Sequence, residues 1–267
     1  MQNTKARAAD RESAPRRHGV QTIARAAAVL RALERAPHGL GLGEIATAVE
    51  LPKSTVHRLV AALAEEDLIA QEPGGKVRLG GGIARLAAAG REALSERLRP
   101  ILLELRRDLD ETVDLAVLDG AAVRFVDQIP APRRLRASSA AGEVFPLHCS
   151  ANGKALLAAM PEEQTLALLP RRLPRLTPHT IVSRDELRVE LAQIRREGVA
   201  LDHEEHTEGI CAAGAVVIDA SGPVAAISVP VPVQRFRGEE ERIAERVKGA
   251  ASTGSELLSG RKPAGAR

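Results

Sequence analysis

The chain has 267 residues with 38 basic and 35 acidic side chains, and its 44% hydrophobic content is enough to bury one large core or two modest ones. No stretch approaches the roughly 20 apolar residues of a membrane span, and Cys149 and Cys211 are too few for a disulfide framework, so we expect a cytoplasmic protein with no membrane partner. The absence of Trp and Tyr argues against the aromatic platforms of single-strand nucleic-acid binders, but a protein that contacts the grooves of a duplex needs none.

Residues 1–17 are predicted to form a disordered basic arm. They contain five basic and two acidic side chains and therefore account for the whole net charge of +3. Such a segment is typical either of an arm that follows DNA phosphates or of a solvated tail, and the sequence leaves both open. At the other end, residues 260–267 are rich in Gly, Pro and Arg and are also predicted to be disordered.

Residues 18–80 carry the pattern of a DNA-binding domain. An apolar helical period begins after Thr22, its expected N-cap, and a second short helix is predicted at Gly43–Val49. A third helix is predicted from Lys53, with apolar residues spaced as on one buried face. A Pro-Gly-Gly turn then predicts a β-hairpin over residues 68–79. Three helices and a hairpin in this order predict a winged helix-turn-helix.

The third helix is expected to enter the DNA major groove, because no acidic residue occurs from Lys53 to Ala64. The expected contact residues have short hydroxyl or basic side chains and lie opposite the apolar face of the helix: Lys53, Ser54, Thr55, His57 and Arg58. In the hairpin, Lys76 and Arg78 are expected to reach the phosphate backbone or the neighbouring minor groove. The alternatives are a three-helix protein-interaction module with a solvated face and a plain solvated hairpin.

The rest of the chain is predicted to form a second domain of α+β class at residues 99–259, after a linker helix at residues 81–98. Alternating apolar residues and turn signals predict antiparallel strands at 112–118, 122–129, 215–219 and 224–230. Further helices are predicted to start at Pro100, after the capping box at Ser183 and at about Glu239, and Gly198 is expected to end the middle one.

Motifs in both domains resemble those of one protein family. The segments that carry the resemblance are Gly39–Ala46, Leu51–Leu59, Pro146–Ala158, Glu197–Glu205, Gly209 and Ala226–Val229. In this order they are similar to the IclR-type bacterial transcriptional regulators, over roughly residues 19–258. The resemblance implies a homodimer or a tetramer. Each chain would have an N-terminal winged helix-turn-helix, a linker helix and a C-terminal GAF-like domain that binds a small metabolite.

The second domain also has a candidate effector site. Small residues at 150–153 precede an apolar helical run, and the free N–H groups at the start of a helix suit an anion such as a carboxylate. The expected contact residues are Ser150, Ala151, Asn152, Asp202, Cys211 and Ser228. Either Cys211 or Ala212 occupies the family's pocket position, and Pro230 and Pro232 stand where the family often has Ser and Gly. The alternative is that Asn152 only caps the helix.

Catalytic and metal sites are the rival interpretation of the same domain. His148 and Cys149 suggest a base and a thiol, but neighbours on a strand point to opposite faces. A zinc site would draw on His203, Glu205, His206 and Cys211, whose spacing matches no standard site. We therefore expect no catalytic residue, metal or cofactor. The sequence predicts a transcriptional regulator, not an enzyme, whose binding to operator DNA changes when a small carboxylate binds.

Overall fold

The computed structural model describes residues 16–137, 139 and 141–260, with the backbone alone at residues 16–20. The described residues form two compact units, divided between Gly90 and Arg91. The predicted basic arm lies outside the described residues up to residue 15, while Arg16 and Arg17 already belong to a helix. The predicted tail also lies outside them from residue 261. None of the described helices is long and apolar enough to cross a membrane.

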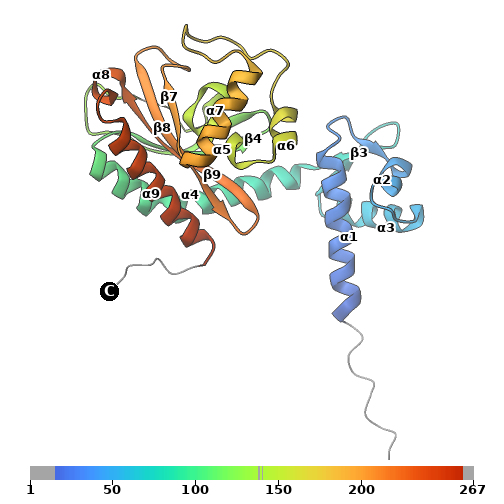
Figure 1. Ribbon diagram of the computed structural model, residues 1–267. Helices are drawn as coiled ribbons and strands as arrows, with labels where there is room; N and C mark the ends of the chain where they lie inside the picture. Colours follow the sequence, from blue (N-terminus) through green and yellow to red (C-terminus); the bar gives the residue numbers. More distant parts are fainter. Residues whose placement is uncertain (1–15, 138, 140, 261–267) are drawn as a thin grey trace, which may run out of the picture. The chain divides into compact units, whose positions relative to one another are not determined.

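The first unit is a winged helix-turn-helix, as the sequence predicted. Its elements are α1 (Arg16–Glu34), β1 (Leu40–Gly41), α2 (Leu42–Ala48), α3 (Lys53–Glu65), β2 (Ile69–Gln71) and β3 (Lys76–Leu79) (Figure 1). Helix α1 starts earlier than predicted, so Thr22 lies inside it and is not its N-cap. The buried face of α3 packs on α1 and α2 through apolar side chains such as Val29, Ile45 and Val60.

The β2–β3 hairpin is attached to the same core. Its register pairs Ile69 with Leu79 and Gln71 with Val77, and β1 adds a third antiparallel strand beside β3. Ile69 and Val77 are buried against the helices, whereas the other residues of the two strands are exposed. Gly74 and Gly75, at the turn, both have positive φ angles, which glycine adopts without strain.

Helix α4 (Gly81–Leu109) corrects the prediction of two separate helices. Pro100 lies inside it, although a proline in a helix interior costs about 3 kcal/mol. The apolar stripe continues across the proline, and Leu98, Leu102 and Leu105 are all buried in the core of the second unit. This burial on both sides of Pro100 offsets the missing hydrogen bond, so the helix does not end there.

The second unit is built on a six-stranded antiparallel sheet with the order β6-β5-β4-β9-β8-β7. The strands are β4 (Val113–Asp119), β5 (Ala122–Ile129), β6 (Val144–Pro146), β7 (Ala200–His203), β8 (Ile210–Asp219) and β9 (Gly222–Pro232). Strands β8 and β9 are longer than predicted. The first half of β8 contains Ala212, Ala213 and Gly214, which have low strand propensity, and its pairing with β7 and β9 keeps it extended.

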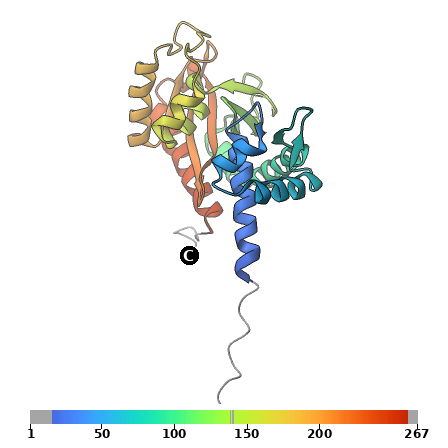
Figure 2. The same ribbon diagram turned by 90° about the vertical axis from the view of Figure 1, so that its right-hand side faces the viewer.

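Helices cover both faces of this sheet (Figure 1; Figure 2). The second half of α4 and α9 (Glu240–Leu258) pack on one face, and α5 (Ala151–Ala159) and α7 (Arg184–Glu197) lie on the other. The remaining short elements are η1 (Leu147–Cys149), α6 (Glu162–Leu168) and α8 (Val233–Phe236). Side chains alternate between the two cores along each central strand, since successive residues of a strand point to opposite faces. The second unit therefore has three layers.

Candidate functional site

The first candidate site is the exposed face of α3. Lys53, Ser54, His57 and Arg58 are exposed and Thr55 is half-buried, while Val56, Leu59, Val60 and Leu63 are buried on the other side. Five of the seven residues predicted to contact DNA thus belong to the first two turns of one helix. Among the described residues, neither Lys53 nor Arg58 forms an ion pair, so both positive charges are available to a partner.

The two predicted cations of the hairpin are exposed but already have contacts. Arg78 forms an ion pair with Glu72 across the hairpin, and Lys76 Nζ lies 3.5 Å from the carbonyl oxygen of His38. A phosphate that approaches Arg78 must therefore compete with the Glu72 carboxylate. This makes the hairpin a weaker anion-binding element than the start of α3.

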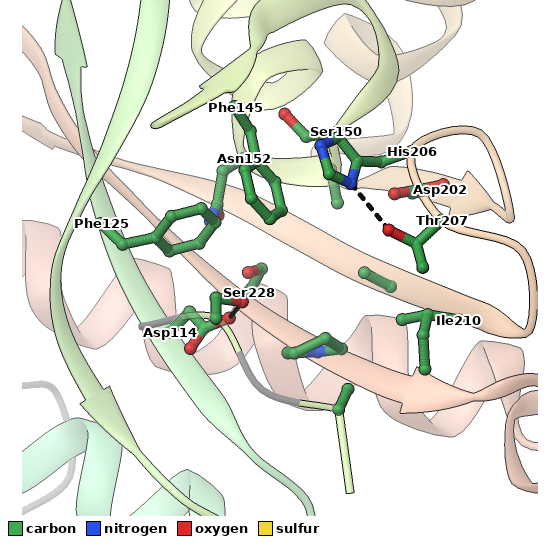
Figure 3. Close-up of a pocket in the computed structure, with 15 residues that line it drawn as sticks. Asp114, Phe125, Phe145, Ser150, Asn152, Asp202, His206, Thr207, Ile210 and Ser228 are labelled. Carbon is green, nitrogen blue, oxygen red and sulfur yellow. Dashed lines mark hydrogen bonds between the residues drawn. The ribbon is translucent and has the colours of Figure 1, made fainter. Parts of the chain in front are cut away.

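The second candidate site is a cavity of about 110 Å³ between the sheet and the start of α5 (Figure 3). Its walls come from strands, from α5 and from connecting segments: Asp114, Phe125, Ala137, Ser139, Phe145, Ser150, Ala151, Asn152, Asp202, His206, Thr207, Ile210, Ala212, Ser228 and Pro230. Five of the six predicted effector residues line it, and Cys211 does not. Pro230 also forms part of the wall.

Ser150 is the residue that caps α5. Its hydroxyl accepts a hydrogen bond from the Gly153 N–H at 3.2 Å and donates one to the Pro146 carbonyl at 2.9 Å. The alternative that Asn152 only caps the helix is therefore wrong. Asn152 lies in the first turn of α5, is 2% exposed, and its Oδ1 has no hydrogen-bond partner among the described residues. Asn152 belongs to the wall of the cavity, although this oxygen is itself buried.

Glycines allow α5 to approach its neighbours closely. A Cβ on Gly153 would lie 2.6 Å from the Cα of Leu147, and one on Gly214 would lie 2.8 Å from the carbonyl carbon of Ala151. Both contacts are shorter than a real Cβ makes, so larger residues would push α5 away from η1 or β8. The position of the helix N-terminus in the cavity wall thus depends on these two glycines.

Alternation along β8 separates Cys211 from the cavity. Cys211 packs with Ala213 and Val217 in the core beneath α4 and α9, while its neighbour Ala212 faces α5 and lines the cavity. Burial raises the pKa of the Cys211 thiol to about 11, so it stays protonated at neutral pH. Of the two alternatives open in the sequence, the geometry therefore selects Ala212, because a shift of one residue reverses the face of a strand.

The sequence did not predict the aromatic part of the cavity. Phe125 and Phe145 meet edge to face at 4.8 Å between ring centroids, and the His206 ring stacks on Phe145 at 3.7 Å (Figure 3). Burial lowers the pKa of His206, so the ring is neutral at pH 7. The available signal was that Phe125 and Phe145 are two of only three Phe residues in the chain.

Two buried carboxyl groups also line the cavity. Asp114, opposite Ser228 in the β4–β9 ladder, has its pKa raised to about 7 by burial, despite hydrogen bonds from Gln128 and Ser139. Burial and the nearby charge of Glu205 raise the pKa of Asp202 to about 7 as well. The sequence analysis missed Asp114, although an acidic residue between the apolar residues Val113 and Leu115 of a strand signals a functional group.

A buried ion-pair network fixes the turn after β7. Lys154, on α5, is 0% exposed, and its Nζ lies 2.5 Å from Glu205 Oε1 and 2.9 Å from Glu190 Oε1. Burial lowers the pKa of Lys154, but the charges of Glu205 and Glu190 outweigh this effect and the net shift is upward. The backbone N–H of Glu205 donates to Asp202 Oδ1 at 2.7 Å. The network thereby connects α5 to the turn that carries His206 and Thr207 into the cavity.

The rival catalytic and metal sites are not assembled. His148 and Cys149 lie in the 3₁₀ helix η1, not in a strand; His148 Nε2 lies 2.9 Å from the Pro174 carbonyl oxygen, and burial raises the pKa of Cys149 to about 12. His203 contacts the Phe236 ring in the α4–α9 core, whereas His206 stacks on Phe145 on the other face. In the described part of the chain, no three His, Cys, Asp or Glu residues gather as metal ligands.

The winged helix-turn-helix and the cavity-bearing domain define the class of the protein as a DNA-binding transcriptional regulator. Two family models match the chain: the IclR helix-turn-helix domain at residues 22–73 and the bacterial transcriptional regulator IclR C-terminal domain at residues 86–256. The chain therefore belongs to the IclR family, whose members are regulators and not enzymes.

Individual relatives agree with this assignment. The HTH-type transcriptional regulator Rv1719 of Mycobacterium tuberculosis is 51% identical over 87% of this chain and 90% of its own. The transcriptional repressor IclR of Escherichia coli is 33% identical over 87% of each chain. A crystal structure of an IclR homologue from Microbacterium hydrocarbonoxydans complexed with 4-hydroxybenzoate is 26% identical, with a TM-score of 0.57 over 89% of this chain and 98% of that one.

Proposed function

We propose that this chain is a one-component regulator whose affinity for operator DNA changes when a small carboxylate binds in the cavity. The observation that carries the proposal is that one chain combines an exposed, acid-free start of α3 with a partly apolar cavity that is lined by the small and polar residues at the start of α5. The first feature suits a duplex and the second suits a small ligand.

On the DNA side, α3 enters the major groove, where Lys53, Ser54, Thr55, His57 and Arg58 contact base edges and phosphates. Lys76 and Arg78 contact the backbone from the hairpin. A homodimer places two such helices on half-sites about 34 Å apart, so the operator is a near-palindrome. The family assignment and the exposed charges of Lys53 and Arg58 support this model.

On the effector side, the cavity volume suits a small ligand of about one ring or less. A cavity of roughly 150 Å³ holds benzene, and this one has about 110 Å³. The small residues at the start of α5 support a carboxylate, since the N–H groups of a helix N-terminus attract anions. The 4-hydroxybenzoate complex of the 26%-identical homologue supports a ligand of the same class. The ligand must bind two states of the regulator unequally to change its DNA affinity.

The test is a selection of duplex DNA by the purified full-length protein, followed by titrations of the selected sequence at several salt concentrations. We expect specific binding that weakens steeply with salt, because phosphate contacts release counterions. Adding single-ring and shorter carboxylates should shift the affinity. Absence of salt-dependent duplex binding would contradict the DNA-binding half and favour a protein-interaction module.

A further inference from the structure

The charge of the cavity does not match that of a carboxylate. Its walls contain the carboxyl groups of Asp114 and Asp202, and among the described residues that line it there is no Lys or Arg. The buried Lys154 lies behind the wall, with its ammonium group held by Glu205 and Glu190 at 2.5 and 2.9 Å. An anion that enters this site therefore meets like charge in a desolvated space, which costs free energy unless a proton enters with it.

The two carboxyl groups differ in their surroundings. Asp114 accepts hydrogen bonds from side chains at both oxygens, from Gln128 Nε2 and Ser139 Oγ, each at 2.8 Å. These donors favour the ionised form of Asp114. Asp202 instead accepts backbone N–H groups of its own turn, from Glu205 and His206, and no side-chain donor among the described residues. Burial and the Glu205 carboxylate oppose its ionisation, and the carboxylate outweighs the favourable charge of Lys154. Asp202 is thus the carboxyl group better placed to take a proton.

Among the described groups on its side of the cavity, Asp202 is the one whose pKa is raised to about 7, as the pKa of Asp114 is on the β4 side. The groups around Asp202 come from the turn after β7, from α5, from η1 and from β8: Glu205, His206, Lys154, Cys149 and Cys211. Burial keeps both thiols protonated and the imidazole neutral, and Lys154 and Glu205 form an ion pair. A change of protonation from pH 7 upward on this side of the cavity therefore falls on Asp202.

We infer that the cavity binds a carboxylate together with one proton from solvent, held between the carboxyl group of the ligand and Asp202. The only bond formed is the O–H bond of that shared proton, and the pair then has one negative charge in place of two. Two carboxyl groups in contact cannot both stay ionised, so they share a proton. This inference rests on the proposed function, because it concerns the same cavity and the same class of ligand. A neutral amide of the same shape needs no proton.

The consequence is a pH-dependent affinity for carboxylates. Above the pKa of Asp202, about 7, each binding event must take up a proton, so the affinity falls about tenfold per pH unit. Below that pH the group is already protonated and the affinity levels off. Amides of the same acids should bind equally at all these pH values.

The experiment is calorimetry on the full-length protein between pH 6 and 9, with benzoate, 4-hydroxybenzoate and pyruvate as probes and their amides as matched controls. Each titration is run in two buffers of different ionisation heat, which counts the protons exchanged. At pH 8 we expect close to one proton taken up per carboxylate and none per amide. Asp202→Asn should bind the carboxylates with no proton uptake and a flat pH profile, since its amide donates the hydrogen bond that the shared proton provides.

Three outcomes would overturn the inference. If the wild-type protein binds carboxylates without proton uptake, the inference is wrong and the proposed function stands. If proton uptake persists in Asp202→Asn and disappears in Asp114→Asn, the proton belongs to Asp114 instead. If none of the probes or amides binds at any pH, the proposed effector cavity itself fails, and the inference fails with it.

Discussion

The exposed face of α3 and the cavity beside α5 are built in opposite ways. The α3 face takes its five residues from the six consecutive positions 53–58 of one helix. The cavity takes its walls from residues between Asp114 and Pro230, which β-sheet pairing brings together. A site of the first kind depends on local helix formation, whereas a site of the second kind depends on the packing of the whole unit. Substitutions on the exposed face of α3 should therefore change DNA binding without changing stability. Substitutions around the cavity should change ligand binding, the folding of the second unit, or both.

The two sites also differ in the exposure and pairing of their charged side chains. The cations of α3 are exposed and keep their hydration, so each contributes modestly and in a salt-dependent way. The charged groups beside the cavity are buried, and each needs a partner. Lys154 is 0% exposed and has two carboxylate partners. This contrast predicts which substitutions cost most.

The largest effect is expected from Lys154→Ala. Removing the ammonium group leaves Glu205 buried without its partner, and breaking such a pair costs about 3–5 kcal/mol in the free energy of unfolding. The matched control is Lys248→Ala, which removes a more exposed lysine paired with Glu245 at 2.8 Å and should cost at most about 1 kcal/mol. Urea unfolding of both variants measures the difference. Equal losses would show that burial of the pair does not matter.

Next in size is Ala212→Val, which adds two methyl groups to the cavity wall. The ligand should lose at least about a hundredfold in affinity, or roughly 2.7 kcal/mol, because the free volume is small. The neighbouring Cys211→Ala should leave ligand affinity unchanged and lower stability by about 1 kcal/mol, since Cys211 packs in the other core. Calorimetry and thermal unfolding of the two variants separate these effects. Loss of ligand binding in Cys211→Ala would contradict the conclusion that Cys211 and the cavity lie on opposite faces of the sheet.

A smaller effect is expected from Arg58→Ala, which should weaken specific operator binding by about 1–3 kcal/mol without changing stability or ligand affinity. Arg58→Lys distinguishes two roles, because lysine keeps the charge but cannot form the paired hydrogen bonds of arginine with guanine. Rescue by lysine indicates a phosphate contact, and no rescue indicates a base contact. Unchanged affinity in Arg58→Ala, measured by anisotropy titrations, would remove Arg58 from the interface.

The smallest effect is expected from Glu72→Gln in the hairpin. This substitution releases Arg78 from its ion pair, so all duplexes should bind a few-fold more tightly and the salt slope should steepen by about one. Glu65→Gln, at the end of α3, changes the net charge equally but releases no arginine. If both variants bind duplexes with the same affinity, the change in affinity comes from net charge alone, and Arg78 does not contact the DNA phosphate backbone.

Much of the fold was predictable because its signals are local. Helix α3 begins at Lys53 as predicted, β5 spans Ala122–Ile129 as predicted, and the Ser183 hydroxyl accepts the Glu186 N–H at the start of α7. Predictions were wrong where tertiary packing outweighed a local signal. Pro100 did not end α4, because apolar residues on both sides of it are buried in one core.

The sequence alone determined the class of the protein, the winged helix-turn-helix and the residues that α3 exposes, since a helical period places these side chains without further information. Only the tertiary structure decided the walls of the cavity. The side of the sheet on which the Cys211 side chain lies depended on the register of β8. The stacking of His206 on Phe145 depended on a turn that is fixed by the ion pair of Lys154 and Glu205. Contacts between residues far apart in the chain leave no periodic pattern in a single sequence. Strand pairing and buried ion pairs bring these residues together, and both are seen only in the tertiary structure.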